Sequence, residues 1–434
     1  MRKYSNEITP SMDGEKVEVA GWVHDRRKLG GLMFIVLRDR AGLIQVTLPK
    51  KFVSPEIFEI ARSLSKETVV SINGKVQKEE KAPNGYEVIP ESIDVLSRAA
   101  TPLPLDPTGK VDANLDTRLD NRIMDLRRAE VNAVFRIRDV ALSAGREFLG
   151  KSGFIEIQTP SIISTSSEGG TELFPVSYFE KEAFLAQSPQ LYKQMMMGTG
   201  LDRVFEIATY FRAEEHDTIW HLNEVTAIDC ELAFIKDETD VMKVIEGLVI
   251  AMMNGVRKRC SQQLDILKRE IPKPKTPFPM LRYDDVLKTL EDEGMRIPFG
   301  EDLTTETEKK LGEIMKEKGH ELYFVTKYPL RIKPFYTMPD TNPIYSNSFD
   351  LEYSGREVVS GSQRVHEHDL LVERIKKKGM NPESFKSYLS AFKHGMPPHG
   401  GFGLGIERFL TLLLDLSNIR EAVLFPRDRK RLEP

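Results

Sequence analysis

Apolar and polar residues alternate with a period of two along five short stretches of the first hundred residues, as expected for half-buried β-strands. The predicted strands are Val17–Val23, Met33–Leu37, Ile44–Leu48, Thr68–Val76 and Tyr86–Ile89. Glycine- and asparagine-containing turns separate most of them, and one helix is predicted over Pro55–Leu64. Five strands with one helix fit the OB-fold, a small barrel that binds oligonucleotides, and equally fit a generic small β-barrel.

Beyond residue 130 the hydrophobic period switches repeatedly between that of a helix and that of a strand. The predicted elements are a long amphipathic helix over Val131–Phe148, a strand over Phe154–Gln158, a strand pair over Val204–Arg212 and Glu224–Phe234, a hairpin over 346–361, and a strand running into a helix over Gly401–Leu414. Residues 238–320 are charged, rich in helix signals and without motifs, so we interpret them as an insertion. This order predicts an α+β domain on a largely antiparallel sheet.

A connection between two domains is indicated by the segment AATPLPLDPTGKVD at 99–112, where three prolines stiffen the chain. We therefore predict a multidomain protein. Its parts are an N-terminal β-barrel at 1–98, a hinge at 99–130 and an α+β domain at 131–434 that contains the helix-rich insertion at about 238–320.

The charge balance argues against a protein that coats nucleic acid, because 62 basic and 66 acidic residues give a net charge of −4. Any contact with RNA must then use local patches. The only cysteines, Cys230 and Cys260, form no disulfide framework, which fits a reducing compartment. No signal peptide and no apolar run of about 20 residues is present, so we expect a cytoplasmic protein without a membrane partner.

The first segment with recognisable chemistry is FRAEEHDTIWHLNE, at 211–224, where an arginine ends a strand and an acidic, histidine-containing loop follows. A guanidinium at Arg212 could neutralise a phosphate through two parallel hydrogen bonds. The alternative for this segment alone is a solvated hairpin loop.

The second segment is FDLEYSGREVVSGSQR, at 349–364. If Tyr353 pairs with Arg356 across the turn, Asp350 pairs with Val359, and Glu357 lies on the same face at a diagonal distance of roughly 7–8 Å. Two carboxylates at that spacing can share a hard cation, with Ser360 as a further oxygen donor. The alternative is a charged, exposed face of the sheet.

Two further segments stand out. In HGGFGLGIERF, at 399–409, dense glycines let a flat ligand lie against the backbone, and Arg408 falls in the first turn of a helix, where phosphate is favoured. The alternative is a tight strand-to-helix turn. In FLAQSPQLYKQ, at 184–194, Lys193 stands in apolar surroundings and would need an anionic partner if buried. The alternative is a surface lysine.

Together, and in this order, the segments resemble the class II aminoacyl-tRNA synthetases over essentially the whole chain. Ile155–Pro160, residues 211–231 and Gly401–Arg408 look like the three motifs of that class. The sequences QSPQLYKQ, SGSQR and PPHGGFGLGIER are similar to its aspartate-specific members of subclass b, particularly the short archaeal and eukaryotic type. The resemblance implies an OB-fold for anticodon binding, followed by a class II catalytic domain on an antiparallel sheet.

The resemblance implies a two-step reaction with ATP as co-substrate and Mg²⁺ as cofactor. The α-carboxylate of L-aspartate attacks the α-phosphorus of ATP, and the 3′-terminal hydroxyl of tRNA then attacks the carbonyl of the aspartyl-adenylate. Catalysis therefore depends on positioning and charge neutralisation. Arg212 and Arg408 are the implied catalytic residues, at the α- and γ-phosphates. The implied ATP contacts are Arg212, Glu214, Trp220, His221, Leu222, Glu357, Gly405 and Arg408, and the implied magnesium ligands are Asp350, Glu357 and Ser360. Trp220 departs from the arginine common in relatives.

The implied contacts to aspartate are Glu168, Ser188, Gln190, Lys193, Arg212, Asp229, Ser360 and Arg364, with Glu168 on a mobile loop. Lys193 and Arg364 are expected to pair with the side-chain carboxylate. Asparagine could not compensate two buried cations, which argues against an asparaginyl enzyme. A lysyl enzyme would need acidic residues instead.

In the barrel, Phe34 and Gln45 match the pair that stacks on and hydrogen-bonds to the central anticodon base, although Phe34 alone could be barrel core. Members specific for aspartate tRNA tend to carry Trp and Lys where this chain has His24 and Pro83. We therefore predict a non-discriminating enzyme that charges tRNA(Asp) and tRNA(Asn), with a separate amidotransferase converting the misacylated product.

The resemblance also implies a homodimer. Three alternatives remain beside this prediction: a strictly discriminating aspartate–tRNA(Asp) ligase, a non-catalytic RNA-binding paralogue, and a related asparagine-making ligase. The paralogue would usually lack a motif arginine or a magnesium carboxylate, yet Arg212, Glu357 and Arg408 are present. The asparagine-making relatives lack the barrel.

Overall fold

The chain forms two compact units in a computed structural model that describes residues 2–164, 172–215 and 218–434. The first unit comprises residues 1–128 and the second residues 129–434. None of the helices in the described ranges is long and apolar enough to cross a membrane.

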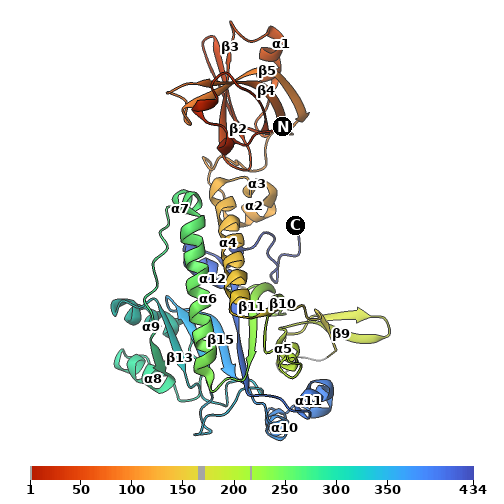
Figure 1. The fold of residues 1–434 in the computed structure, drawn as a ribbon, viewed down its shortest axis with the longest axis vertical. Coiled ribbons are helices and arrows are strands. Elements are labelled where there is room, and N and C mark those ends of the chain that lie inside the picture. The colour runs from red at the N-terminus through yellow and green to blue at the C-terminus, as the bar shows by residue number, and fades with distance from the viewer. Residues whose placement is uncertain (1, 165–171, 216–217) are drawn as a thin grey trace. The chain divides into compact units, whose positions relative to one another are not determined.

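The first unit is built around a closed five-stranded barrel with the strand order β1-β2-β3-β5-β4 (Figure 1). Its strands are β1 (Lys16–Leu29), β2 (Leu32–Arg38), β3 (Leu43–Pro49), β4 (Val69–Lys78) and β5 (Tyr86–Ser97). Helix α1 (Pro55–Ser63) lies between β3 and β4 in the sequence. All neighbouring strands are antiparallel except β3 and β5, which are parallel. The predicted OB-fold is therefore confirmed.

Strict alternation along β2 shows which side chains fill the barrel. Met33, Ile35 and Leu37 are buried in the core, whereas Phe34 between them is partly exposed. Phe34 is therefore not a core residue, because its side chain leaves the barrel on the outer face.

The residues expected as a hinge, 99–130, carry two short helices and the beginning of a long one. The two short helices are α2 (Leu115–Asp120) and α3 (Arg122–Asp125). Within α3, Arg122 and Asp125 form a fully buried ion pair of 2.6 Å.

The second unit is organised on an eight-stranded sheet with the order β12-β13-β14-β15-β16-β11-β10-β6. Its strands are β6 (Ile155–Glu156), β10 (Arg203–Phe211), β11 (Glu224–Ala233), β12 (Met280–Arg282), β13 (Leu322–Thr326), β14 (Ser348–Tyr353), β15 (Glu357–Gln363) and β16 (His399–Gly405). The central strands are antiparallel, as predicted, while the edge strands β12 and β6 pair in parallel.

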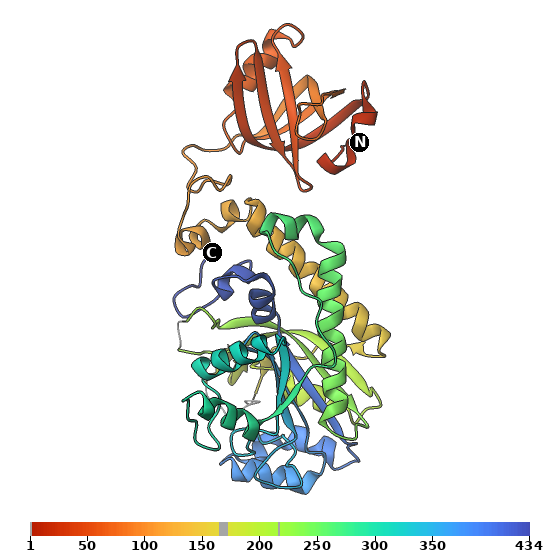
Figure 2. The same ribbon diagram turned by 90° about the vertical axis from the view of Figure 1, so that its left-hand side faces the viewer.

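Two long helices, α4 (Ala129–Lys151) and α6 (Glu238–Arg259), run side by side along one face of this sheet (Figures 1 and 2). They approach closely at Gly255, where an added Cβ would lie 2.6 Å from the Cβ of Ala144. Alternate residues of the strands, such as Ile228 and Phe402, point into the core that the helices cover. The opposite face of the sheet carries polar side chains.

The segment expected as one insertion, 238–320, divides between two packing environments. Helix α6 and part of α7 (Ser261–Leu267) belong to the main core. Helices α8 (Tyr283–Asp292) and α9 (Thr305–Glu317) instead form a separate hydrophobic cluster with β13.

The remaining elements flank the sheet. They are the small sheet of β7 (Ile162–Ile163), β9 (Lys181–Leu185) and β8 (Pro175–Tyr178), helices α5 (Gln190–Met196), α10 (His368–Lys377), α11 (Lys386–Phe392) and α12 (Ile406–Leu414), and the 3₁₀ turns η1 (Ser5–Glu7), η2 (Pro10–Met12), η3 (Pro382–Phe385) and η4 (Ile419–Ala422).

The predicted register of the β14–β15 hairpin is wrong by one residue. Tyr353 does pair with Arg356 at the turn, but the register shifts between Leu351 and Glu352. The extra residue of this β-bulge is the buried Val358. Asp350 consequently lies opposite Ser360 rather than Val359.

Candidate active site

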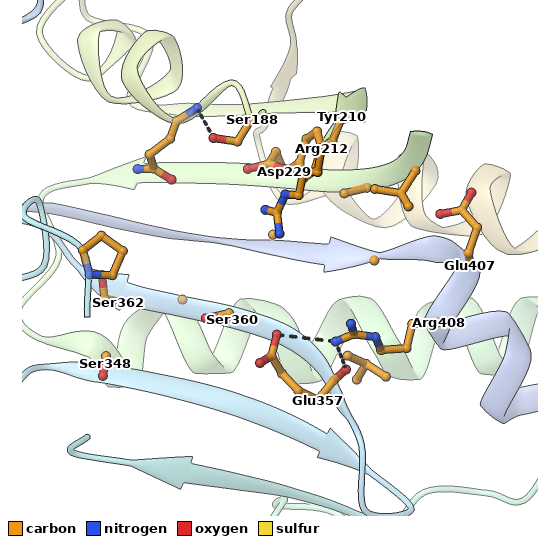
Figure 3. Close-up of a pocket in the computed structure, with 18 of the residues that line it drawn as sticks. Ser188, Tyr210, Arg212, Asp229, Ser348, Glu357, Ser360, Ser362, Glu407 and Arg408 are labelled. Carbon is orange, nitrogen blue, oxygen red and sulfur yellow. Dashed lines mark hydrogen bonds and ion pairs between the residues drawn. The ribbon is translucent and has the colours of Figure 1, made fainter. Parts of the chain in front are cut away.

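The polar face of the central sheet borders a cavity of about 350 Å³ (Figure 3). Strands β10, β11, β15 and β16 supply most of its walls, together with the loop between β10 and β11. The predicted site residues that line it are Ser188, Gln190, Arg212, Glu214, Trp220, His221, Leu222, Asp229, Glu357, Ser360, Arg364, Gly405 and Arg408. Residues separated by more than 200 positions in the sequence therefore meet in one cavity.

Among the described residues predicted for the aspartate and magnesium sites, two do not line the cavity. Lys193 and Asp350 are both buried in its immediate surroundings, where each pairs with a charged neighbour. Glu168 lies outside the described residues.

A buried network of four charges forms one end of the site. The ammonium of Lys193 lies 2.7 Å from Asp229 and 3.3 Å from Glu231. The guanidinium of Arg364 pairs with the same Glu231 at 3.0 Å. It also donates a hydrogen bond of 2.7 Å to the hydroxyl of Ser362. Two cations and two carboxylates of the chain thus balance each other.

The two carboxylates of this network differ in their proton affinity. Burial raises the pKa of Asp229 in spite of the nearby Lys193. Burial also acts on Glu231, but Arg364 and Lys193 together hold the pKa of its carboxyl below the ordinary value. Asp229 faces the cavity, with Oδ2 buried and without a hydrogen-bond partner. That oxygen is available to a hydrogen-bond donor of a ligand.

Behind this network lies a neutral histidine. Nδ1 of His399 is 2.9 Å from the carbonyl oxygen of Pro397, to which it can only donate, so Nε2 accepts from the amide of Gln194 at 3.1 Å. Burial lowers the pKa of His399 to about 4.

Two glycines of β16, Gly403 and Gly405, line the floor of the cavity. An added Cβ at Gly401 would lie 2.1 Å from Oε2 of Glu231, so only glycine leaves room for that buried carboxylate. At Gly403 an added Cβ would meet only Asp229 and Tyr210, at 3.4 and 3.5 Å, and would project into the site. The floor is therefore backbone, against which a flat ligand can lie.

Arg212 follows β10 directly and points into the cavity from the opposite wall to Arg408 (Figure 3). The amide of Arg212 donates to the carbonyl of Asn223 at 2.9 Å, which closes the hairpin behind it. Along the same loop, His221 lies 3.8 Å from Glu214. The ring of Trp220 is covered by the guanidinium of Arg356, 5.1 Å from its centre.

The far end of the cavity is acidic and closely paired with cations. Nη1 of Arg408 lies 3.8 Å from the Glu357 carboxylate and donates to its backbone carbonyl at 2.9 Å (Figure 3). Lys333 lies 2.8 Å from Asp350 and 3.8 Å from the centre of the Tyr328 ring. Burial and the neighbouring Asp350 raise the pKa of Glu357.

These oxygen donors fit a hard divalent cation. Asp350 and Ser360 are partners on the adjacent strands β14 and β15, and Glu357 of β15 lines the cavity. Oδ1 of Asp350 is buried without a hydrogen-bond partner. Carboxylate and hydroxyl oxygens near a phosphate site are the ligands that Mg²⁺ prefers. Within the described ranges, no group of three His, Cys, Asp or Glu residues is arranged to hold a metal ion alone. Such a cation would therefore depend on ligand oxygens as well.

Glu231 and Lys333 are among the charged residues of the site that were not predicted. Glu231 follows Asp229 by two positions on the same strand, so strand alternation alone could have placed both on one face. Lys333, by contrast, lies in an irregular segment after β13, where no periodic pattern indicates the direction of a side chain.

The predicted anticodon residues lie in the first unit. Phe34 is on the outer face of β2, and the amide of Gln45 on β3 donates to Glu87 at 3.2 Å. His24 lies at a β-bulge of β1, and Pro83 is exposed in the turn between β4 and β5. These positions give the barrel an outer surface with aromatic, amide and imidazole groups, as oligonucleotide recognition requires.

Comparison with known proteins agrees with this architecture. Residues 17–96 match the model of the OB-fold nucleic acid binding domain, and residues 114–429 match that of the class II tRNA synthetases (D, K and N). The chain is 58% identical to aspartate–tRNA(Asp) ligase of Thermococcus kodakarensis and 54% identical to aspartate–tRNA(Asp/Asn) ligase of Methanopyrus kandleri, each over 99% of both chains.

Among solved structures, asparaginyl-tRNA synthetase from Pyrococcus horikoshii in complex with asparaginyl-adenylate superposes with a TM-score of 0.94 at 34% identity, covering all of both chains. The barrel, the glycine-floored cavity and these similarities over the full length agree: the chain belongs to the class II aminoacyl-tRNA synthetases of the D, K and N group.

Proposed function

We propose that this protein is an aspartate–tRNA ligase that activates L-aspartate with ATP and transfers it to tRNA(Asp) and tRNA(Asn). The observation that carries the proposal is one cavity that brings Arg212 and Arg408, which could neutralise phosphates, together with Arg364 of the buried network that also contains Lys193 and could receive a carboxylate. The curated relatives at 52–58% identity, named aspartate–tRNA(Asp) or aspartate–tRNA(Asp/Asn) ligases, support it.

In the first step the aspartate α-carboxylate attacks the α-phosphorus of ATP, and pyrophosphate leaves. Arg212 binds both the α-phosphate of ATP and the attacking α-carboxylate of aspartate. Its positive charge holds these two anions close together and neutralises the negative charge that develops in the transition state. Arg408 holds the γ-phosphate end. Glu214, His221 and the backbone near Leu222 contact the adenosine part, which lies on the backbone floor at Gly405.

In relatives an arginine often occupies the position of Trp220. Here Arg356, from the turn between β14 and β15, brings a guanidinium to the ring of Trp220 and pairs with Glu308 at 3.3 Å. We infer that Arg356 supplies part of the positive charge that the loop itself lacks.

Selection of aspartate over asparagine follows from hydrogen-bond polarity rather than from unpaired cations. The sequence suggested that asparagine would leave the cations of Lys193 and Arg364 uncompensated. In the structure Asp229 and Glu231 already pair with them, so that argument does not hold. Arg364 presents only N–H donors to the cavity. A substrate carboxylate offers them two acceptor oxygens. The side-chain amide of asparagine offers only one oxygen, and its NH2 group would face the remaining N–H donor, which leaves a buried donor unpaired. Ser188, Gln190 and Ser360 complete the pocket, and Glu168 is proposed to close over the substrate amine.

Asp350, Glu357 and Ser360 would hold Mg²⁺ together with oxygens of ATP. When bound, the ion would neutralise phosphate charge and orient the leaving pyrophosphate. Lys333 pairs with Asp350 at 2.8 Å and also acts on Glu357, so its charge reduces the repulsion between the two carboxylates.

The barrel is proposed to bind the anticodon, with Phe34 stacking on the central base and Gln45 hydrogen-bonding to it. His24 and Pro83 are proposed to permit both tRNAs, and a tRNA-dependent amidotransferase would then convert aspartyl-tRNA(Asn). We further propose that the protein is cytoplasmic and that it forms a homodimer. The homodimer is supported by Ile155 on the edge strand β6, an apolar residue that is 48% exposed. The strictly discriminating alternative is favoured by the names of four relatives at 57–58% identity.

The test is aminoacylation with labelled aspartate, ATP and Mg²⁺, using purified tRNA(Asp) and tRNA(Asn) transcripts in parallel. Charging of both is expected. Charging of tRNA(Asp) alone would establish the discriminating enzyme. A protein that charges neither, and shows no aspartate-dependent ATP–pyrophosphate exchange, would be the non-catalytic paralogue.

A Glu357→Gln variant tests the cation site in the same exchange assay. The Mg²⁺ concentration for half-maximal exchange should increase at least about 10-fold, because a charged ligand becomes neutral. Glu246→Gln is the matched control, since Glu246 instead accepts from the amide of Phe278. Equal Mg²⁺ dependence of both variants would remove Glu357 from the site.

A further inference from the structure

The end of the barrel where His24 lies is built on one buried carboxylate, that of Glu67. Glu67 has a backbone φ of +66°, which is costly for a residue other than glycine and persists only where the surroundings fix it. Its amide donates to the carbonyl of Val23 at 2.8 Å, and its side chain is 1% exposed. Glu67 is therefore a rigid anchor inside this end of the barrel.

Two arginines are fastened to that anchor. Arg38 donates to both oxygens of Glu67, at 2.9 and 2.6 Å, and Arg127 donates to one of them at 2.8 Å. Both guanidiniums also lie over the ring of Trp22, 5.7 and 5.5 Å from its centre. The planar fork of Arg38 is consequently fixed in position and direction.

The same fork reaches His24. Nη1 of Arg38 lies 3.1 Å from Nδ1 of His24, which stands at the β-bulge between Val23 and Asp25. A guanidinium can only donate, so Nδ1 must accept. The ring is then the neutral tautomer with its proton on Nε2. Burial and the charge of Arg38 lower the pKa of His24, which agrees with a neutral ring.

We propose that Arg38, fixed by Glu67, is a positioning residue for reading the last anticodon base, because it holds His24 as a neutral Nε2–H donor that serves either pyrimidine at that position. The inference rests on the proposed function, in which the barrel reads the anticodon.

The chemistry of the two bases explains why such a donor is permissive. The anticodons differ only in their last base, cytosine for aspartate and uracil for asparagine. Cytosine offers N3 and O2 as acceptors on its Watson–Crick edge, and uracil offers O4 and O2. A nitrogen that only donates finds an acceptor on either base. If Nε2 of His24 carried no proton, it would accept a hydrogen bond instead. The donor groups of cytosine and uracil lie at different positions, so such an acceptor would distinguish the two bases.

The turn that contains Pro83 belongs to the same end of the barrel. The amide of Asn84 donates to the carbonyl of Leu43 at 2.9 Å, and Leu43 is the strand partner of Arg38. Pro83 adds neither a charge nor a side-chain hydrogen-bonding group there. His24 thus supplies the base-reading group at this end, and Arg38 determines its polarity.

The tautomer can be measured directly by NMR on the full chain labelled with ¹⁵N-histidine, with the signal of His24 identified by its loss in a His24→Gln variant. At neutral pH, Nδ1 should be unprotonated and Nε2 protonated. An Arg38→Met variant should give a mixture of tautomers. Arg127→Met is the matched control, because it removes a guanidinium from Glu67 and Trp22 without touching His24, and it should keep the wild-type signal.

Kinetics then link the tautomer to recognition. Arg38→Met should raise the KM for tRNA(Asp) and for tRNA(Asn) by a similar factor of about 2 to 10, the loss of one net hydrogen bond, with kcat and ATP–pyrophosphate exchange unchanged. In a His24→Ala background, Arg38→Met should have no further effect, as a double-mutant cycle requires for residues that act together.

Two outcomes would overturn the inference. One is a proton on Nδ1 in the wild type, which needs no variant to observe, and the other is an effect of Arg38→Met on tRNA KM that persists without His24. Wild-type protein that charges neither tRNA would instead refute the proposed function, while the tautomer measurement would still report on Arg38 and His24.

Discussion

The ammonium of Lys193 and the carboxylate of Asp229 form an ion pair of 2.7 Å in which 3% and 4% of the two side chains are exposed. Nothing in the local sequence around Lys193 shows this partner, which is 36 residues away on a different element. The pair fixes the end of the cavity where the amino acid is proposed to bind.

Replacing Lys193 by Met should therefore destabilise the fold strongly. Asp229 and Glu231 would remain buried together with Arg364 alone, and breaking a buried ion pair on one side costs about 3–5 kcal/mol. Urea unfolding measures this change. The control is Lys243→Met, which removes an exposed partner of Asp240 and should change the stability by less than about 1 kcal/mol. Equal stability of the two variants would contradict the buried network.

Two glycines of one strand should respond differently to the same substitution. Gly401→Ala forces a Cβ to within 2.1 Å of Glu231 and should lower the melting temperature by several degrees. Gly403→Ala meets no atom closer than 3.4 Å, so it should fold normally. Its methyl group enters the cavity, however, and should raise the KM for aspartate or ATP about 10-fold. Melting curves and ATP–pyrophosphate exchange on both variants separate the two effects; a stable, fully active Gly403→Ala enzyme would show that the floor does not bind substrate.

Phe34→Ala should weaken tRNA binding without affecting aspartate activation. Stacking of a base on an aromatic ring contributes about 1–3 kcal/mol, which corresponds to an increase of the tRNA KM by roughly 5- to 150-fold. Phe52 is another surface phenylalanine of the barrel, 83% exposed, and Phe52→Ala provides the control. If both variants bind tRNA equally well, Phe34 does not stack on a base.

The buried His399 should make the stability dependent on pH. Burial lowers its pKa from 6.5 to about 4, so between these values the unfolded chain binds a proton that the folded chain does not. Its contribution is complete above pH 6.5 and decreases as the pH falls toward 4, by about 3 kcal/mol. The difference in unfolding free energy between the wild type and His399→Asn should shrink over that range. A difference that stays constant from pH 7 to pH 4 would mean that His399 titrates normally.

Much of the fold follows from local patterns in the sequence. The pair β10 and β11 begins and ends within a residue of the predicted strands, because buried residues recur along both strands, from Val204 to Tyr210 and from Ala227 to Ala233. The register at Asp350 could not be obtained in this way, since a β-bulge at Val358 adds a residue without changing the apolar pattern. The small sheet of β7, β8 and β9 was also not predicted, because few of its side chains are buried.

The candidate site was predicted to a similar extent. Arg212, Glu357 and Arg408 were found from motifs and meet in one cavity. Lys333 was missed because its role depends on a contact with Asp350, which only tertiary packing creates. The sequence left open whether Phe34 belongs to the barrel core. The structure shows that it does not, because Met33, Ile35 and Leu37 on the same strand fill the core and Phe34 alternates with them.

The four charges of Lys193, Asp229, Glu231 and Arg364 sum to zero without a ligand. A pocket whose charges were not balanced by the chain itself would depend on its substrate for neutrality. Here the dehydration of these ions is completed once, when the chain folds, and not again at every turnover. Lys193, Asp229, Glu231 and Arg364 are therefore expected to contribute to folding as well as to the site.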